Sequence, residues 1–434
     1  MKLAIFSSIC VCLLLANQSA NAENLLQVYQ RAKQYDAQLK AQESLHLANL
    51  EQGKQVRANL KPQATLSTDT AYTLERDTNS HQTNNGVQVN YALALAQPLY
   101  NPKLKATIAQ VDAQSSQSNE TLEAARQDLI LRVASAYFAA LQAQDNVTLA
   151  QAEQKAISHQ LQQAQAYFDA GRSAITDVKE AEASHAAVQT QVITATQQLD
   201  IAQEQLRVLT GVSYSQIDAP HANMPLSIPE PITIDAWVNL AKQNNHTIHA
   251  TQQALNAARQ GVNVQRATKQ PNVELFAKQT ASYLDSGVYN HQRTQDIAVG
   301  VSLSMPLYTG GATTSKIREA QFNLQQAQQI HTLQTNQTEQ QTRSAFLSVQ
   351  SSISQIAANK QALTSAETAL QATRAGFEVG TRTSVDVLNA VRSEFRARRD
   401  YANARYTYLL NTLQLRQAAG TLNDKDITTI SEFM

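Results

Sequence analysis

The stretch Asp296-Ile-Ala-Val-Gly-Val-Ser-Leu-Ser-Met305 alternates large apolar residues with small or polar ones. A period of two places successive side chains on opposite faces of a β-strand, so this stretch predicts a strand with one apolar face. An equivalent stretch, VQVNYALALA, occupies residues 87–96. Weaker alternation precedes each of them, at 66–74 and at 273–277. The sequence therefore predicts two β-hairpins, with polar loops at residues 75–86 and 285–295.

The two hairpins belong to a duplication that covers most of the chain. Phe168-Asp-Ala-Gly171 recurs as Phe377-Glu-Val-Gly380, 209 positions later, and Leu206–Gly211 recurs as Leu415–Gly420 at the same spacing. Four prolines then predict an extended linker between the halves, because proline cannot continue a helix. The expected organisation is a first repeat at 23–219 with its hairpin at about 62–100, a linker at 220–232, a second repeat at 233–422 with its hairpin at about 271–308, and a C-terminal tail at 423–434.

The remaining sequence predicts long helices. Small and apolar residues recur at alternating steps of four and three, the heptad spacing of supercoiled helices. The first such seam consists of Leu129, Val133, Ala136, Ala140, Ala143, Val147, Ala150, Ile157, Leu161, Ala164 and Phe168, and its twin extends from Ala345 to Phe377. A helix from about residue 103 to 168 would measure roughly 100 Å at 1.5 Å per residue. We therefore expect an elongated architecture with helical turns at about residues 169–176 and 378–384.

The first 22 residues have the pattern of a secretory signal peptide. Lys2 precedes an apolar core, and Ala20-Asn21-Ala22 supplies a cleavage site with small residues. Both cysteines, Cys10 and Cys12, lie in this segment, so the exported chain is expected to contain none. Charges balance at 35 basic and 35 acidic residues, which disfavours nucleic acid as a partner. Beyond the signal no apolar stretch approaches the roughly 20 residues of a membrane helix.

Four amphipathic strands of about ten residues match the length of membrane-spanning β-strands. An open sheet edge in hydrocarbon leaves backbone groups unpaired, so such strands must close into a barrel. Known single-chain barrels begin at about eight strands, so four strands would have to pair with strands from other copies of the chain. Two, three or four copies would each suffice, and the pattern does not choose among them. A soluble pair of hairpins covering helices would produce the same alternation.

Three motifs in the C-terminal part carry a family resemblance: Gly380-Thr-Arg-Thr-Ser-Val-Asp-Val-Leu388, Ala402-Asn-Ala-Arg-Tyr-Thr-Tyr-Leu409 and Gly420-Thr-Leu-Asn423. The sequence resembles the TolC family of outer-membrane efflux and secretion channels. The resemblance implies a mainly α fold with a membrane β-barrel: a homotrimer whose chains share one twelve-stranded barrel, with coiled-coil helices forming a tunnel in the periplasm of a Gram-negative bacterium. It also implies a passive duct without cofactors, which docks with a periplasmic membrane-fusion adaptor and an inner-membrane transporter of the ABC, RND or MFS type.

The resemblance also implies roles for residues at the two helical turns. Arg382 of one coiled coil would bind Thr176 and Asp177 of a neighbouring coil and hold the periplasmic entrance closed. Phe377 stands where a tyrosine is usual, so a hydroxyl tie to Asp177 is missing. The pore selectivity ring would consist of Asp386 and of Asn389, which replaces a second carboxylate. The helix-tip residues expected to meet the adaptor are Gly171, Gly380, Thr381 and Arg382.

The same turn residues also fit a purely structural role. Glycine at 171 and 380 suits the left-handed residue that ends a helix. Ser173 and Thr383 are predicted helix caps, and Thr383 with Asp386 has the spacing of a capping box. The structural and functional roles are compatible.

Other chemistry finds little support in the sequence. His246 and His249 lie three apart on a predicted helix, but no Cys, Asp or Glu in the same turn completes a metal site. Motifs of phosphate-binding loops, serine hydrolases and zinc hydrolases are missing, so no enzyme is predicted. The main alternative is a soluble periplasmic coiled-coil adaptor, which would be expected to carry one helical hairpin between compact β domains rather than two equivalent halves.

Overall fold

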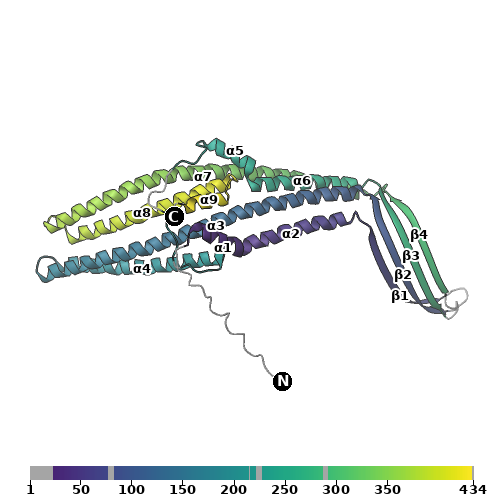
Figure 1. The fold of residues 1–434 in the computed structure, drawn as a ribbon, viewed down its shortest axis with the longest axis horizontal. Helices are drawn as coiled ribbons and strands as arrows, with labels where there is room; N and C mark the ends of the chain where they lie inside the picture. The colour runs from purple at the N-terminus through teal and green to yellow at the C-terminus, as the bar shows by residue number, and fades with distance from the viewer. Residues whose placement is uncertain (1–22, 77–82, 215, 221–226, 287–291, 433–434) are drawn as a thin grey trace, which may run out of the picture. The chain divides into compact units, whose positions relative to one another are not determined.

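The computed structural model describes residues 23–76, 83–214, 216–220, 227–286 and 292–432. In chain order its elements are α1 (Leu25–Tyr35), α2 (Ala37–Ala58), β1 (Gln63–Arg76), β2 (Thr83–Tyr100), α3 (Pro102–Asp169), α4 (Ile175–Thr210), α5 (Ile234–Asn244), α6 (His246–Ala267), β3 (Asn272–Ser286), β4 (Gln292–Ser304), α7 (Ala312–Glu378), α8 (Ser384–Ala418) and α9 (Asp424–Ser431) (Figure 1). The predicted signal segment, residues 221–226 of the predicted linker, the centres of both predicted hairpin loops and residues 433–434 lie outside the described ranges.

The described chain forms two compact units, and each unit takes segments from both sequence repeats. The helical unit comprises the residues up to Lys40, residues 125–243 and the residues from Gln340 onward. The strand unit comprises Ala41–Ala124 and Asn244–Glu339. The duplicated halves of the sequence are therefore not compact units by themselves, because elements of one half pack against elements of the other.

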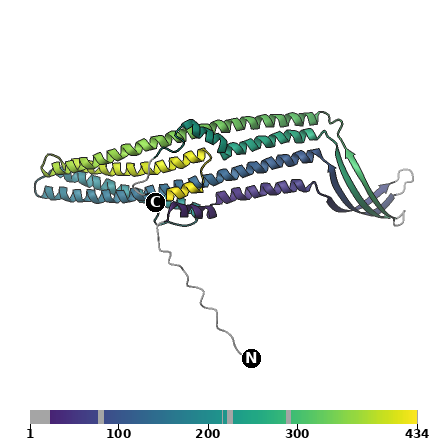
Figure 2. The ribbon, with the colours of Figure 1, turned by 45° about the horizontal axis from the view of Figure 1, so that its top comes forward.

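The strand unit contains an antiparallel sheet with the strand order β1-β2-β3-β4, which curves along its length (Figure 2). The register places Leu66 opposite Leu93, Leu93 opposite Gln279, and Gln279 opposite Ile297, so these positions share one face. Twelve large apolar side chains of that face are 40–74% exposed: Leu66, Tyr72, Leu74, Val87, Tyr91, Leu93, Leu95, Leu275, Ile297, Val299, Val301 and Leu303. The one-sided apolar pattern predicted for these strands is confirmed.

The strands extend beyond the limits that the polarity pattern predicted. β1 continues to Arg76 and β2 begins at Thr83, so the loop predicted over residues 75–86 is wrong at both ends. β3 and β4 shorten the loop predicted over 285–295 in the same way. Backbone groups pair across these segments whatever their side chains, so polarity alone misplaces the strand ends. β2 also passes Pro98 with a register irregularity, as expected where a proline cannot donate to the ladder.

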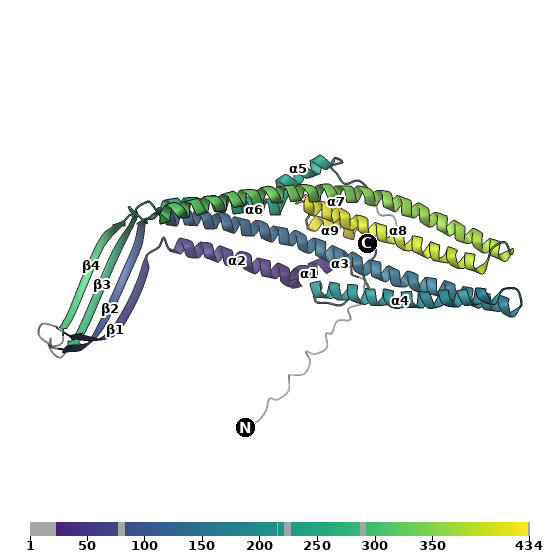
Figure 3. The ribbon, with the colours of Figure 1, turned by 180° about the vertical axis from the view of Figure 1, so that it is seen from behind.

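In the helical unit, α4 lies beside the second part of α3, and α8 beside the second part of α7 (Figures 1 and 3). The predicted helix from about residue 103 to 168 is confirmed by α3. Most of its predicted heptad seam is at most 9% exposed: Leu129, Val133, Ala136, Ala140, Ala143, Ala150, Ile157 and Ala164. Small side chains at such positions allow neighbouring helices to approach closely. Within the described ranges, no helix has an apolar segment long enough to cross a membrane.

The C-terminal residues form a helix, which the prediction of a tail at 423–434 missed. Asn423 caps α9 in a capping box with Asp426. The Tyr29 hydroxyl of α1 donates to the Asp424 carboxylate at 2.7 Å. The partner Tyr29 lies almost four hundred residues earlier, so local sequence pattern could not reveal this bond, whereas the capping box joins residues only three apart.

Candidate functional site

Two equivalent turns close the α3–α4 and α7–α8 hairpins of the helical unit. Gly171 and Gly380 have φ angles of 70° and 77°, in the left-handed region that glycine enters without steric cost. In each turn the N–H after the glycine donates to the carbonyl five residues earlier, as from Thr381 to Gly376 at 2.8 Å. This bond belongs to a common motif that ends helices. Both glycines therefore have a clear structural role.

The two turns differ in how the following helix begins. Thr383 caps α8 in the predicted capping box: the Asp386 N–H donates to its hydroxyl at 3.2 Å, and its own N–H donates to the Asp386 carboxylate at 2.9 Å. Hydrogen bonds from the Thr383 backbone and hydroxyl hold the pKa of Asp386 below its usual value. The prediction that Ser173 caps α4 is wrong, because the capping position is occupied by Ala174, which forms no side-chain hydrogen bond. The buried Ser173 hydroxyl has no partner among the described residues.

The predicted latch residues lie at the start of α4 and in the α7–α8 turn. Thr176 and Arg382 are exposed, and Asp177 is partly buried in the first turn of α4. Among the described residues of this single chain, no hydrogen bond joins Arg382 to Thr176 or Asp177. The stem of Arg382 lies over Gly376: a Cβ added there would come within 2.8 Å of the Arg382 Cγ. The tie between neighbouring coils stays a prediction.

Phe377 packs inside the chain rather than pointing freely from the turn. It contacts the apolar core that α3, α4, α7 and α8 share, and its ring centroid lies 5.6 Å from that of Tyr167. The Arg172 guanidinium lies 4.9 Å from the centroid of the Tyr167 ring, within the range of a cation–π contact. A stack of arginine, tyrosine and phenylalanine thus joins the two tips of one chain. The sequence analysis did not predict this stack, although Tyr167 precedes Gly171 by four residues and Arg172 follows it directly.

The predicted ring residues lie one helical turn apart on α8. Asn389 lines an open groove of about 330 Å³ between α4 and α8, together with Glu180 and Arg392. Asp386 precedes Asn389 by three residues, and Arg392 follows it by three, so the three side chains are neighbours along the helix surface. A carboxylate, an amide and a guanidinium therefore follow one another along α8.

A buried carboxylate lies further along the same bundle. Glu153 of α3 is 7% exposed and accepts a hydrogen bond from Gln191 of α4 at 3.4 Å. Burial raises the pKa of Glu153, and the guanidinium groups of Arg399, Arg392 and Arg396 on α8 oppose that rise. The charged form of Glu153 is therefore less favourable in the folded protein than in water.

We expect Glu153→Gln to reduce the dependence of stability on pH. A carboxyl whose pKa is raised by folding adds stability that is complete below the unfolded-state pKa of about 4.3 and is lost as the pH rises through the folded pKa. The wild-type melting temperature should therefore fall more steeply above about pH 4.3 than that of the variant. Thermal melts followed by circular dichroism measure both slopes. Glu182→Gln is the control, since Glu182 is exposed and paired with Lys179; equal slopes for wild type and Glu153→Gln would contradict the expectation.

His246, one of the two histidines rejected as metal ligands, takes part in a cross-helix contact. His246 Nδ1 lies 2.8 Å from a carboxylate oxygen of Glu120 on α3, and the rings of His246 and His249 are 6.5 Å apart. No Asp or Glu lies in the same helical turn as His246 in the sequence, and its carboxylate partner comes from another helix. Within the described ranges no group of three ligand-type side chains could hold a metal ion.

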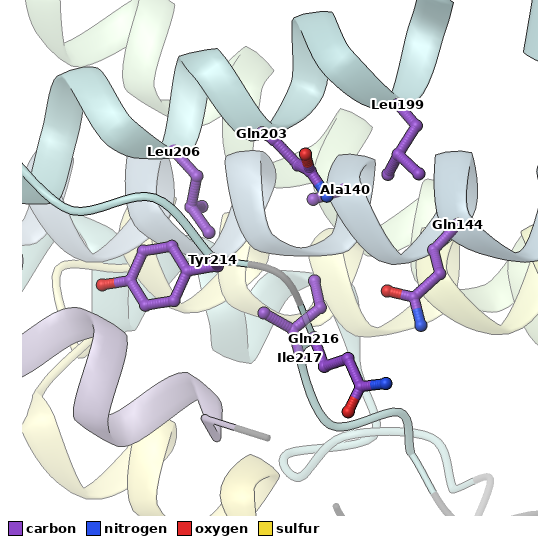
Figure 4. A pocket seen from close by; sticks show the side chains of 8 residues that line it. All are labelled: Ala140, Gln144, Leu199, Gln203, Leu206, Tyr214, Gln216 and Ile217. Atoms are coloured by element: carbon purple, nitrogen blue, oxygen red, sulfur yellow. The ribbon is translucent and has the colours of Figure 1, made fainter. Parts of the chain in front are cut away.

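A pocket between α3, α4 and the residues Tyr214, Gln216 and Ile217 is shown in Figure 4. Ala140, Leu206 and Ile217 form much of its wall, and Gln144 and Gln203 lie at its polar side. It has no space for a water molecule, so it is a gap in packing rather than a ligand site.

Paired long helices that end in tight turns, and a curved sheet that is apolar on one face, are the features expected in the protomer of an outer-membrane channel. The chain belongs to the outer membrane efflux protein family, whose model matches residues 28–212 and again 237–421. The two matches begin and end 209 positions apart, which is the spacing of the internal repeat. The family and the fold are those of channels rather than enzymes.

Relatives match along almost the whole chain. Outer membrane protein TolC of Vibrio cholerae is 33% identical over 415 residues, which cover 94% of this chain and 93% of that protein. Alkaline protease secretion protein AprF of Pseudomonas aeruginosa is 30% identical and covers 96% of this chain and 89% of its own. The solved structure of the outer membrane protein VceC from Vibrio cholerae shares the fold with a TM-score of 0.76 at 20% identity, covering 91% and 96% of the two chains. The protein is thus an outer-membrane exit duct with a helical part in the periplasm.

Proposed function

We propose that three copies of this chain form one channel by joining their sheets into a twelve-stranded barrel. The supporting observation is that β1 and β4 are the edges of the described sheet. An unpaired edge in hydrocarbon costs several kcal/mol for each unsatisfied group, so pairing of β1 with β4 of the next copy removes that cost. The sheet curves along its length in Figure 2, as the wall of a barrel must, and the large apolar side chains of one face are exposed in the single chain, as contact with lipid would require.

The mass of the detergent-solubilised mature protein tests this assembly. We expect native mass spectrometry to give three chains, and membrane fractions to keep the protein through a salt wash. A monomer that stays dissolved without detergent would overturn the channel and favour the soluble adaptor. Two or four chains would overturn the trimer alone.

The channel is proposed to receive cargo from an inner-membrane transporter of the ABC, RND or MFS type through a periplasmic membrane-fusion adaptor. A protein cargo is supported by the relative AprF, whose name connects it with alkaline protease secretion. Small molecules are supported by the efflux family to which the chain belongs. Deletion of the gene should raise sensitivity to dyes or antibiotics, abolish secretion of a protein, or do both. A deletion strain with unchanged sensitivity and unchanged protein secretion would contradict an export role.

The helix tips are proposed as the gate and the docking site. Arg382 would bind Thr176 and Asp177 of a neighbouring coil, and an adaptor would contact Gly171, Gly380, Thr381 and Arg382. The exposure of Thr176 and Arg382 supports this role, since both side chains are available to a second coil. Phe377 contributes by packing on Tyr167, which fixes the α7–α8 tip against α3.

Asp386→Asn is expected to weaken the cation selectivity of the channel, roughly severalfold, because three carboxylates leave the proposed ring. The lowered pKa of Asp386 keeps this group charged at physiological pH. Reversal potentials in planar bilayers under a salt gradient measure the effect. Asn389→Asp is the matched variant: it adds a carboxylate one turn away and should strengthen block by multivalent cations. Selectivity that Asp386→Asn leaves unchanged would remove Asp386 from the ring.

A further inference from the structure

An open cleft of about 910 Å³ lies in the strand unit, where the sheet meets the helices. The end of β2, the start of α3 and the end of α6 enclose it, and Leu60 from the α2–β1 connection adds a wall. Its polar lining contains two cations, Lys105 and Arg266, with the amides of Gln260, Asn263 and Gln270, and contains no carboxylate. Such a lining has the chemistry of an anion site.

The charge around the cleft is uncompensated. Lys61, Lys103 and Lys269 are each adjacent in sequence to a lining residue. Within the described ranges no carboxylate forms an ion pair with these lysines or with Lys105 and Arg266. Five cations at one end of the sheet repel one another, so a bound anion would relieve that repulsion.

The internal repeat shows that one cation lacks the partner that its equivalent has. Arg57 of the first repeat forms an ion pair with Asp112. The positions 209 residues later hold Arg266 and Gln321, so the arginine is kept and the carboxylate is replaced by an amide. Arg57 is neutralised within the protein, whereas Arg266 faces the cleft with its charge free.

Apolar side chains border the cations on the same cleft. Leu60, Leu99 and Tyr100 line it and are 44–56% exposed. Their repeat equivalents Leu307 and Tyr308 are 90% and 88% exposed. Tyrosines at the ends of membrane strands typically lie at the level of the lipid headgroups. In a membrane-spanning sheet, these cations and apolar side chains would meet at the height where a phospholipid changes from headgroup to acyl chain.

We propose that this cleft binds an anionic glycerophospholipid of the phosphatidylglycerol type, with its phosphate between Lys105 and Arg266 and its acyl chains along Leu99 and Tyr100. The proposal rests on the outer-membrane location of the sheet. The site would anchor the channel in the periplasm-facing leaflet at the junction between the strands and the helices. No covalent step is involved.

The test compares lipids retained by the assembled wild-type channel. The protein is placed in nanodiscs that contain equal amounts of phosphatidylglycerol and phosphatidylcholine. It is then released, and the lipids that stay bound are identified from its mass by native mass spectrometry. A Lys or Arg near an anionic lipid changes affinity about fivefold, so two should give a preference of about 25-fold for phosphatidylglycerol. In Lys105→Gln/Arg266→Gln this preference should fall to about parity.

Two further variants separate this site from general charge effects. Arg57→Gln should keep the preference, because its cation is already paired with Asp112. Gln321→Asp should lower the preference for phosphatidylglycerol about fivefold. This variant gives Arg266 a carboxylate at the position equivalent to Asp112, the partner of Arg57. Gln321→Asp and the two single variants also serve if the double variant fails to assemble. A preference that stays at the wild-type value in the double variant, or in all three of these other variants, overturns the proposal.

Competition identifies the source of the phosphate. Glycerol 1-phosphate and inorganic phosphate at millimolar concentration should leave phosphatidylglycerol bound, because the acyl chains contribute to binding. Displacement by either would show a site for soluble phosphate and would overturn the lipid assignment. A wild-type channel that inserts as an oligomer without a lipid preference removes only this inference, whereas a protein that stays soluble removes the channel itself.

Discussion

Val301→Lys is expected to prevent stable assembly in the outer membrane. Val301 lies on the apolar face of β4, opposite Leu275 of β3, and is 60% exposed. Lysine near the bilayer midplane of a β-barrel costs about 2–4 kcal/mol, and every copy in an oligomer would carry that cost. The fraction of protein that remains with outer membranes after a salt wash, and migrates as an oligomer on gels without heating, should fall at least about tenfold.

The adjacent residue supplies the control. Ser302 lies on the opposite face of the same strand, opposite Glu274, so Ser302→Lys places a cation beside a carboxylate rather than in lipid. This variant should assemble like the wild type. Equal loss in both variants would mean that the strand tolerates no lysine, and equal assembly of both would mean that the apolar face is not in contact with lipid.

Arg382→Ser should raise the conductance of the channel. An exposed ion pair is worth about 0–1 kcal/mol, so three symmetric ties would hold the closed state by at most about 3 kcal/mol. Their loss shifts the ratio of open to closed channels by up to about a hundredfold. Single-channel recordings in planar bilayers should show longer and larger openings. Unchanged currents would contradict the proposed latch.

Arg172→Ser is the matched control for the latch, because it removes an arginine from the other turn. The Arg172 guanidinium stacks on Tyr167 of its own chain, so its loss should leave the ties between coils in place. Gly376→Ala is a second probe: its methyl group would come within 2.8 Å of the Arg382 Cγ and displace that side chain without removing its charge. Gly376→Ala should therefore resemble Arg382→Ser in its currents, and Arg172→Ser should resemble the wild type.

Much of the fold could be predicted from the sequence, because two periodic patterns each occur twice, the helix seam at a spacing of 209 residues and the end of the strand pattern at 208. Alternation at Ile297 and Val299 identified a strand face, and steps of four and three from Leu129 identified a helix seam. The Thr383–Asp386 capping box was predictable as well, since it depends on residues three apart. Each of these features is set by local geometry, which single-sequence patterns report well.

Features that depend on contacts between distant segments were not predictable. The packing of Phe377 on Tyr167 and the pairing of His246 with Glu120 each join residues more than a hundred positions apart. The α9 helix is stabilised by Tyr29 near the other end of the chain. The wrong prediction of a cap at Ser173 has a different cause. The serine has a suitable side chain, but it lies one residue before Ala174, which occupies the capping position of α4.

The unequal starts of α4 and α8 bear on how the proposed periplasmic entrance would open. A side-chain cap contributes about 0.5–2 kcal/mol, and α8 has one whereas α4 does not. The first turn of α4 therefore unwinds more readily than that of α8. In a ring of three chains, stiff and compliant tips would alternate, so a docking force would be absorbed by the α3–α4 hairpins while the α7–α8 hairpins serve as pivots.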